Sequence, residues 1–173
     1  MKADRSNPKV ATASGRDGAP TAHLAGLSPA YFGMVMATGI VSLAAHLLGA
    51  PLISKALFNI NIAAYAVLWV LTLLRMVRYP RQFFGDMVDH LRGPGFFTTV
   101  AATCILGGQF VLLSADYATA TVLWITALLL WVGLTYTVFT GFTVKEHKPT
   151  LDKGISGAWL LAVVATQAIA VLS

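Results

Sequence analysis

The chain has 173 residues, of which 57% are apolar and only 11% charged, and its net charge is +5. Soluble domains carry roughly 25% charged residues, so a chain this poor in charge is expected to have lipid as its solvent. The single cysteine, Cys104, excludes an internal disulfide framework and a multi-cysteine metal site. Because Cys104 lies in an apolar run, we expect it to be a small buried hydrophobe.

Residues 1–27 differ in kind from the rest of the chain. They are rich in Ala, Gly, Ser, Thr and Pro and contain charged residues, but they hold no apolar h-region. They are therefore not a cleavable signal peptide. We expect a disordered cytoplasmic tail, with the first apolar run acting as the membrane-targeting signal.

Five apolar segments follow, each close to the length of about 20 residues that a helix needs to cross a bilayer. Short polar links separate them, and the transmembrane domain is expected to cover 28–173. The expected spans are 29–49, 55–77, 94–114, 117–143 and 154–173.

The basic residues lie almost entirely on one side of this topology. With the N-terminus inside, eleven of the twelve lysines and arginines are cytoplasmic, and only Lys55 is outside. The positive-inside rule therefore predicts a multi-pass protein of the bacterial inner membrane with a cytoplasmic N-terminus. Since topology accounts for these charges, we expect no nucleic-acid partner.

A short pattern recurs in the first, third and fifth spans. The segments "PAYFGMVMAT" (29–38), "PGFFTTVAAT" (94–103) and "GAWLLAVVAT" (157–166) share an aromatic at position three and Val, Ala and Thr at positions seven, nine and ten. Chance similarity between apolar segments is the alternative to a true repeat. If the repeat is true, the unit is a helical hairpin made of one patterned and one plain helix.

The two kinds of helix also differ in side-chain size. The patterned spans are rich in Gly and Ala, which permit close helix packing in lipid, whereas the plain spans carry bulky Leu and Trp. We therefore expect an all-α integral membrane protein with five transmembrane helices as 2.5 hairpins, the odd helices forming an inner layer around a central axis. Two and a half units leave a ring open, so we expect the chain to be the N-terminal half of a longer protein.

Three stretches resemble the tellurite-resistance/dicarboxylate transporter family, which includes TehA-like proteins, fungal malic-acid and sulfite exporters and the plant slow anion channel. They are "PAYFGMVMATGIVSLA" (29–44), "DHLRGPGFFTTVAATCILGGQF" (89–110) and "EHKPTLDKGISGAWLLAVVATQAIAVL" (146–172). The resemblance implies a ten-helix quasi-fivefold ring with odd helices lining a pore, and a homotrimer as in relatives. The phenylalanine that plugs the pore of structurally known relatives lies on a ninth span, which has no counterpart here.

The spans hold few groups that could bind an ion tightly. No Asp, Glu, Lys or Arg lies deep within them, whereas proton-coupled carriers place such groups mid-membrane. His46 near the outer end of the first span is an interfacial histidine or, alternatively, a proton relay. We therefore expect a passive, weakly binding conduit.

Five residues are candidates to line the pore. Thr38, Thr103 and Thr166 offer hydroxyls, although each could instead bond the carbonyl four residues earlier. Phe32 and Phe97 could form an apolar constriction, although core packing is the alternative for both.

The segment "DHLRGPG" (89–95) is expected at the cytoplasmic mouth, before the third span. There His90 and Arg92 could attract anions, helped by the positive end of the following helix. A role in topology, with a tight Gly-Pro-Gly turn, is the alternative. Many relatives have Pro after this histidine, where Leu91 stands here, so the loop geometry is in question.

Enzyme signatures such as HExxH, GxSxG or a phosphate-binding glycine loop are missing. We therefore expect neither catalysis nor a cofactor nor a metal. The expected function is transport of small anions: C4-dicarboxylates, sulfite, chloride or nitrate, or tellurite-related oxyanions. The alternative is a non-conducting membrane interaction or regulatory subunit, or a non-functional fragment of such a transporter.

Overall fold

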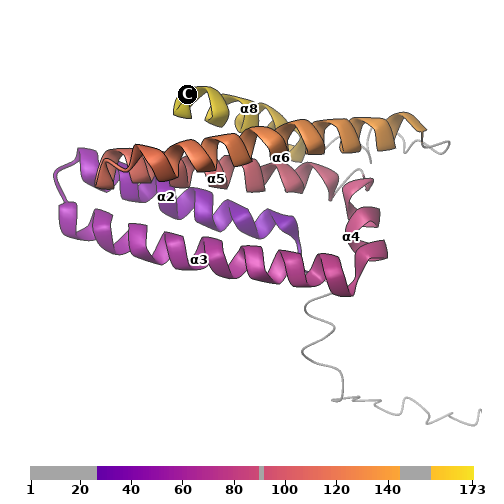
Figure 1. Ribbon diagram of the computed structural model, residues 1–173, viewed down its shortest axis with the longest axis horizontal. Helices are drawn as coiled ribbons and strands as arrows, with labels where there is room; N and C mark the ends of the chain where they lie inside the picture. The colour runs from indigo at the N-terminus through magenta and orange to yellow at the C-terminus, as the bar shows by residue number, and fades with distance from the viewer. Residues whose placement is uncertain (1–26, 90–91, 145–156) are drawn as a thin grey trace, which may run out of the picture.

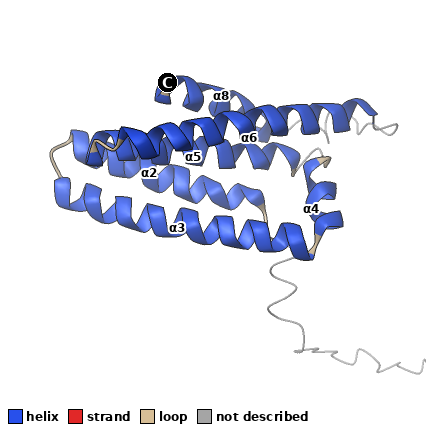
Figure 2. Ribbon diagram, in the orientation of Figure 1, coloured by secondary structure: helices blue, strands red, loops and turns tan. Residues whose placement is uncertain are grey.

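A computed structural model of the chain describes residues 27–89, 92–144 and 157–173. Every regular element in these ranges is a helix, and none is a strand (Figure 2). In chain order they are η1 (Pro29–Tyr31), α2 (Phe32–Leu47), α3 (Pro51–Arg78), α4 (Pro80–Met87), η2 (Gly93–Phe96), α5 (Phe97–Gln109), η3 (Phe110–Ser114), α6 (Tyr117–Val144), η4 (Gly157–Trp159) and α8 (Leu160–Leu172). The predicted tail, up to residue 26, and the polar link at 145–153 lie outside the described residues.

Four helical stretches in the described chain are long and apolar enough to cross a membrane. They are Pro29–Leu47, Pro51–Arg78, Gly93–Ser114 and Tyr117–Gly141, and Gly157–Leu172 is apolar but shorter. This confirms the predicted all-α membrane architecture.

Proline begins four of the helical elements. Pro29, Pro51, Pro80 and Pro94 stand in the first turns of η1, α3, α4 and η2. A first-turn amide has no partner within the helix, so a residue without an N–H loses nothing there. The prolines thus set where the chain turns from a link into a helix.

The polar link between the second and third spans contains a helix, α4, which was not predicted from the sequence. Pro80 starts this helix, and Phe83 and Met87 lie one turn apart and are buried. Arg81 and Phe84 are exposed on it. With one face buried and the other exposed, α4 is a short amphipathic helix. It lies across the end of the bundle, between the ends of α3 and α6 (Figure 1).

The five long helices form two layers. Helices α2, α5 and α8 lie side by side with α5 in the middle, and α3 and α6 pack against α2 and α5 respectively (Figure 1). In the most apolar stretch of each span, 67% of the residues are buried in Gly93–Ser114, which contains α5, against 17% in α3 and in α6. Large apolar side chains are exposed on both outer helices, among them Ile60, Val67, Leu129 and Val132. Lipid can solvate such a surface, and water cannot.

Candidate functional site

Two junctions hold the inner helices together. We call the contact of α2 and α3 with α5 the first seam, and that of α5 and α6 with α8 the second seam. In the first seam Phe32, Val35, Leu68 and Ala102 form one buried cluster. The Phe32 ring stands edge-on to Trp69, with ring centroids 5.7 Å apart.

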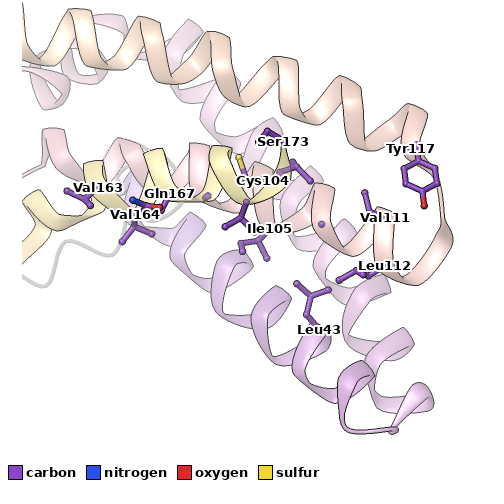
Figure 3. A pocket seen from close by; sticks show the side chains of 14 residues that line it. Leu43, Cys104, Ile105, Val111, Leu112, Tyr117, Val163, Val164, Gln167 and Ser173 are labelled. Atoms are coloured by element: carbon purple, nitrogen blue, oxygen red, sulfur yellow. The ribbon is translucent and has the colours of Figure 1, made fainter.

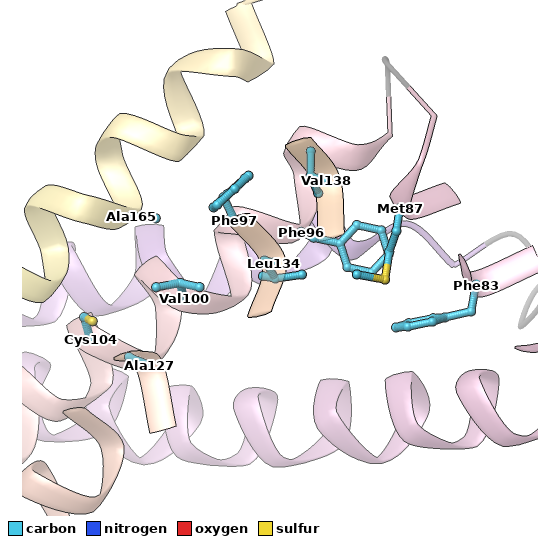
Figure 4. Close-up of a cluster of buried hydrophobic side chains, with 10 residues drawn as sticks. All are labelled: Phe83, Met87, Phe96, Phe97, Val100, Cys104, Ala127, Leu134, Val138 and Ala165. Carbon is cyan, nitrogen blue, oxygen red and sulfur yellow. The ribbon is translucent and has the colours of Figure 1, made fainter. Parts of the chain in front are cut away.

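The second seam uses the same repeat positions. Phe97, Val100 and Ala165 belong to one buried cluster, in which Leu134 of α6 also lies (Figure 4). In each seam the phenylalanine and valine of one repeat pack with the alanine of the next. The alanine is small enough to admit the ring, which gives the alanine and the phenylalanine of the pattern a physical reason.

The threonine that ends the pattern also bonds across a seam. Thr103 donates to the Thr99 carbonyl at 2.7 Å, and its oxygen lies 2.9 Å from the Tyr65 hydroxyl on α3. Since the Thr103 hydrogen is already used, Tyr65 is the donor. Thr166 repeats the arrangement: it donates to the Ala162 carbonyl at 2.9 Å and accepts from Trp131 Nε1 on α6 at 3.0 Å.

The aligned Thr38 is half-buried. No repeat precedes α2 within the described chain. Ala37 and Thr38 of α2 therefore have no described counterpart of Phe32 or of Tyr65 packed against them. Thr38 and Ala37 therefore form an edge of the inner layer.

The structure places Phe32 and Phe97 inside the seams, where each ring is 1% exposed. This is the core-packing arrangement that the sequence left open as the alternative. Thr103 is likewise fully buried, and it makes the backbone bond that was its alternative.

A groove of about 700 Å³ lies between α2, α5 and α8 (Figure 3). On its α5 side Ile105, Gly108 and Leu112 follow one another at helical spacing, and α8 supplies the amide of Gln167. None of the five predicted pore-lining residues borders it. Its lining is Leu43, Cys104, Ile105, Gly108, Val111, Leu112, Tyr117, Val163, Val164, Gln167, Ala168, Val171, Leu172 and Ser173.

A pair of buried amides in the first seam was missed by sequence reasoning. Asn61 Nδ2 donates to Gln109 Oε1 at 2.6 Å, and both side chains are fully buried. Asn61 Oδ1 and Gln109 Nε2 have no further partner in the described chain. Gly39 lies against the pair, and a Cβ there would collide with Ile105 and press on Asn61. Amides within apolar runs were the available signal, since lipid penalises an unpaired polar group.

At the end of the bundle where α4 lies, two arginines share one carboxylate. Arg75 is only 2% exposed and pairs with Asp86, while Phe83 stands 6.0 Å from its guanidinium carbon. Arg92 Nη1 lies 3.1 Å from the same Asp86 oxygen, and the Arg92 side chain is 51% exposed. Asp86 therefore offsets part of the charge that Arg92 was expected to offer to anions. His90 lies outside the described residues.

Comparison with known proteins gave one match. A family model described as SLAC1, voltage-dependent anion channel, matches residues 26–173. No curated protein and no solved structure matches the chain.

Proposed function

The chain belongs to the SLAC1 voltage-dependent anion channel family, and from that premise we propose that it forms the wall of a channel or exporter for small anions. The observation that carries the proposal is the extent of the family match, which begins at residue 26 and includes every described helix. The candidate substrates are C4-dicarboxylates such as malate, sulfite, chloride or nitrate, and tellurite-related oxyanions.

In the proposed assembly α2, α5 and α8 are consecutive inner helices of a quasi-fivefold ring in the bacterial inner membrane, with the N-terminus cytoplasmic and three copies per complex. The central place of α5 between α2 and α8 supports this arrangement. So do the apolar exposed faces of α3 and α6, which suit an outer, lipid-facing layer. The groove between the inner helices then faces the path of the anion.

The chemistry of that groove suits passage without tight binding. Among the described residues its lining holds no Asp, Glu, Lys or Arg, and Gln167 offers a neutral amide donor. An anion would meet dipoles and no fixed opposite charge, so it could leave as readily as it enters. We propose no catalytic step, cofactor or metal for this conduit.

Flux through the reconstituted protein tests the proposal. Liposomes that contain the protein should release chloride, nitrate or malate faster than empty vesicles do. Gly108→Leu should reduce the flux at least severalfold, because a side chain there enters free space in the groove. Gly85→Leu is the matched control, since Gly85 has equally free surroundings on α4 and does not border the groove.

Equal flux in protein-containing and empty vesicles would contradict the proposal and favour the non-conducting subunit or fragment. Flux that Gly108→Leu and Gly85→Leu leave unchanged would instead keep anion transport but remove this groove from its path.

A further inference from the structure

A second groove lies on the opposite, outer side of the inner layer. It has a volume of about 480 Å³ and runs between α3 and α6, with Phe96 and Thr99 from η2 and α5 at its floor and α4 at one end. We call it the outer groove. Its lining is Trp69, Thr72, Leu73, Met76, Phe83, Phe84, Met87, Phe96, Thr99, Thr126, Leu129, Leu130, Gly133, Leu134 and Thr137.

The outer groove offers an apolar surface. Three of its threonines donate their hydroxyl hydrogens to carbonyls of their own helices: Thr99 to Phe96, Thr126 to Val122 and Thr137 to Gly133, at 2.7 to 2.8 Å. Such back-bonding leaves the hydroxyl hydrogen unavailable to a ligand. Apart from the Thr72 hydroxyl, an occupant would therefore meet hydrocarbon and aromatic rings.

The rim of the outer groove faces the bilayer. Leu129 of α6 is 68% exposed, and Phe84 of α4 is 54% exposed. Both flanking helices are long enough to span a membrane and present apolar side chains outward. Chains of bilayer lipid are thus the apolar material nearest to the groove.

One end of the outer groove is basic. Arg81 lies one turn before Phe84 on α4, so it stands on the same side of that short helix as this groove-lining ring. Arg81 is exposed and has no ion-pair partner in the part of the chain that the structure describes. Arg78 is also exposed, but it lies two residues after Met76 and so on the opposite face of α3 from the groove. The carboxylate of α4, Asp86, is engaged by Arg75 and Arg92.

We propose that the outer groove is a binding site for an anionic phospholipid, with an acyl chain between α3 and α6 and the headgroup phosphate at Arg81. An apolar slot beside a basic residue at the membrane surface is the chemistry that selects such lipids. The charge favours this occupant over a second copy of the chain, because an apolar helix packed into the slot would leave Arg81 without a counter-ion. The inference does not depend on anion transport.

Lipid binding to the purified, delipidated protein tests the site. Phosphatidylglycerol and phosphatidylcholine with identical chains are titrated separately, and bound lipid is counted by native mass spectrometry. Wild type should prefer phosphatidylglycerol by roughly fivefold, since one arginine is engaged. Arg81→Gln should lose that preference and still bind both lipids, and Arg78→Gln, on the opposite face of α3, should keep it.

Gly133→Leu tests the slot itself. Gly133 borders the outer groove and has no neighbour near its Cβ position, so leucine fills the slot while favouring the helix. This variant should lose binding of both lipids severalfold. Gly33→Leu, with equally free surroundings on α2 and outside the groove, is the control and should bind as wild type does.

Equal affinity of wild type for the two lipids, or unchanged lipid binding by Gly133→Leu, would overturn the proposal. A Gly133→Leu variant that keeps its lipid but changes its oligomeric state would assign the slot to a second copy instead.

Discussion

The two seams share the same apolar packing but differ in their polar contacts. Both pack a phenylalanine of one repeat with the alanine of the next, and both end in an aromatic that donates to a threonine. The first seam adds the buried pair of Asn61 and Gln109, whereas the threonine of the second seam, Thr166, is exposed.

The difference follows from position. Helix α5 has inner neighbours on both sides, so Thr103 is enclosed by protein. Among the described residues α8 contacts one inner helix, α5, and Leu160 and Val163, which align with Phe32 and Val35, are exposed there. The repeated sequence pattern therefore specifies which side chains pack between adjacent inner helices. The number of neighbouring helices decides how fully those side chains are buried.

The largest expected effect should be the same in both seams. Phe32→Ala and Phe97→Ala each remove a ring from a fully packed cluster, and each should lower the free energy of unfolding by about 3 kcal/mol. Unfolding of the detergent-solubilised protein by denaturant measures this. Phe84→Ala, at an exposed ring, is the control and should cost less than about 1 kcal/mol. A cost below that level at either seam phenylalanine would break the equivalence of the seams.

The amide pair should distinguish the first seam by its coupling. Asn61→Leu or Gln109→Leu alone leaves a buried amide without its partner and should cost about 1–3 kcal/mol. The double variant removes both amides and should cost less than either single change. The four unfolding free energies of this double-mutant cycle provide the measurement, and simple additivity would refute the coupling.

The aromatic donors offer a smaller and unequal comparison. Tyr65→Phe removes the hydrogen bond to buried Thr103 and should cost about 0.6 kcal/mol, the usual size of such bonds between membrane helices. Thr166→Val removes the bond that exposed Thr166 accepts from Trp131 and should cost less. Thermal unfolding of the two variants side by side gives the order, and a larger loss for Thr166→Val would reverse our reading of the seams.

The turn between α2 and α3 and the turn before α6 each contain one residue with a left-handed backbone, which is a glycine in the first and an alanine in the second. Gly49 adopts φ 77° after α2, whereas Ala115 adopts φ 50° before α6. A left-handed backbone costs a residue with a Cβ roughly 1 kcal/mol. Ala115→Gly should therefore raise the melting temperature and Gly49→Ala should lower it. Changes of the same sign in both variants would contradict this account of the turns.

The smallest expected effect is a pH dependence at the start of α6. The Thr119 hydroxyl and then its amide donate to Asp116, and these bonds lower the pKa of that carboxyl below its usual range. Because the folded pKa is depressed, the stabilisation is present above the unfolded pKa of about 3.9 and is lost as pH falls through the folded value. Asp116→Asn should weaken the pH dependence of the free energy of unfolding in this acidic range, as measured by denaturant unfolding at a series of pH values. An unchanged pH dependence would show that Asp116 is not its source.

The helices could be predicted from the sequence, because the length of an apolar run and a proline in the first turn are local features. The repeat also indicated which residues make contacts between helices, since Phe32, Phe97, Thr103 and Thr166 all lie at seams. Which way those side chains point could not be predicted, because the apolar spans show no strong amphipathic periodicity to separate a pore face from a protein face.

The polar contacts were harder still. The pairing of Asn61 with Gln109 joins residues 48 positions apart, and no sequence spacing specifies it. The groove-facing residues Ile105 and Gly108 look like ordinary packing residues in an apolar run, so only the arrangement of three helices distinguishes them.

Cysteine accessibility along α5 tests most directly the claim that the groove, and not the seam, meets the aqueous path. Single cysteines would replace Ile105, Gly108, Ala102 and Thr103 in a Cys104→Ala background of the reconstituted protein. A water-soluble thiol reagent should modify the cysteines at positions 105 and 108 and spare those at 102 and 103, which the structure buries. Modification of the seam positions with protection of the groove positions would contradict the account.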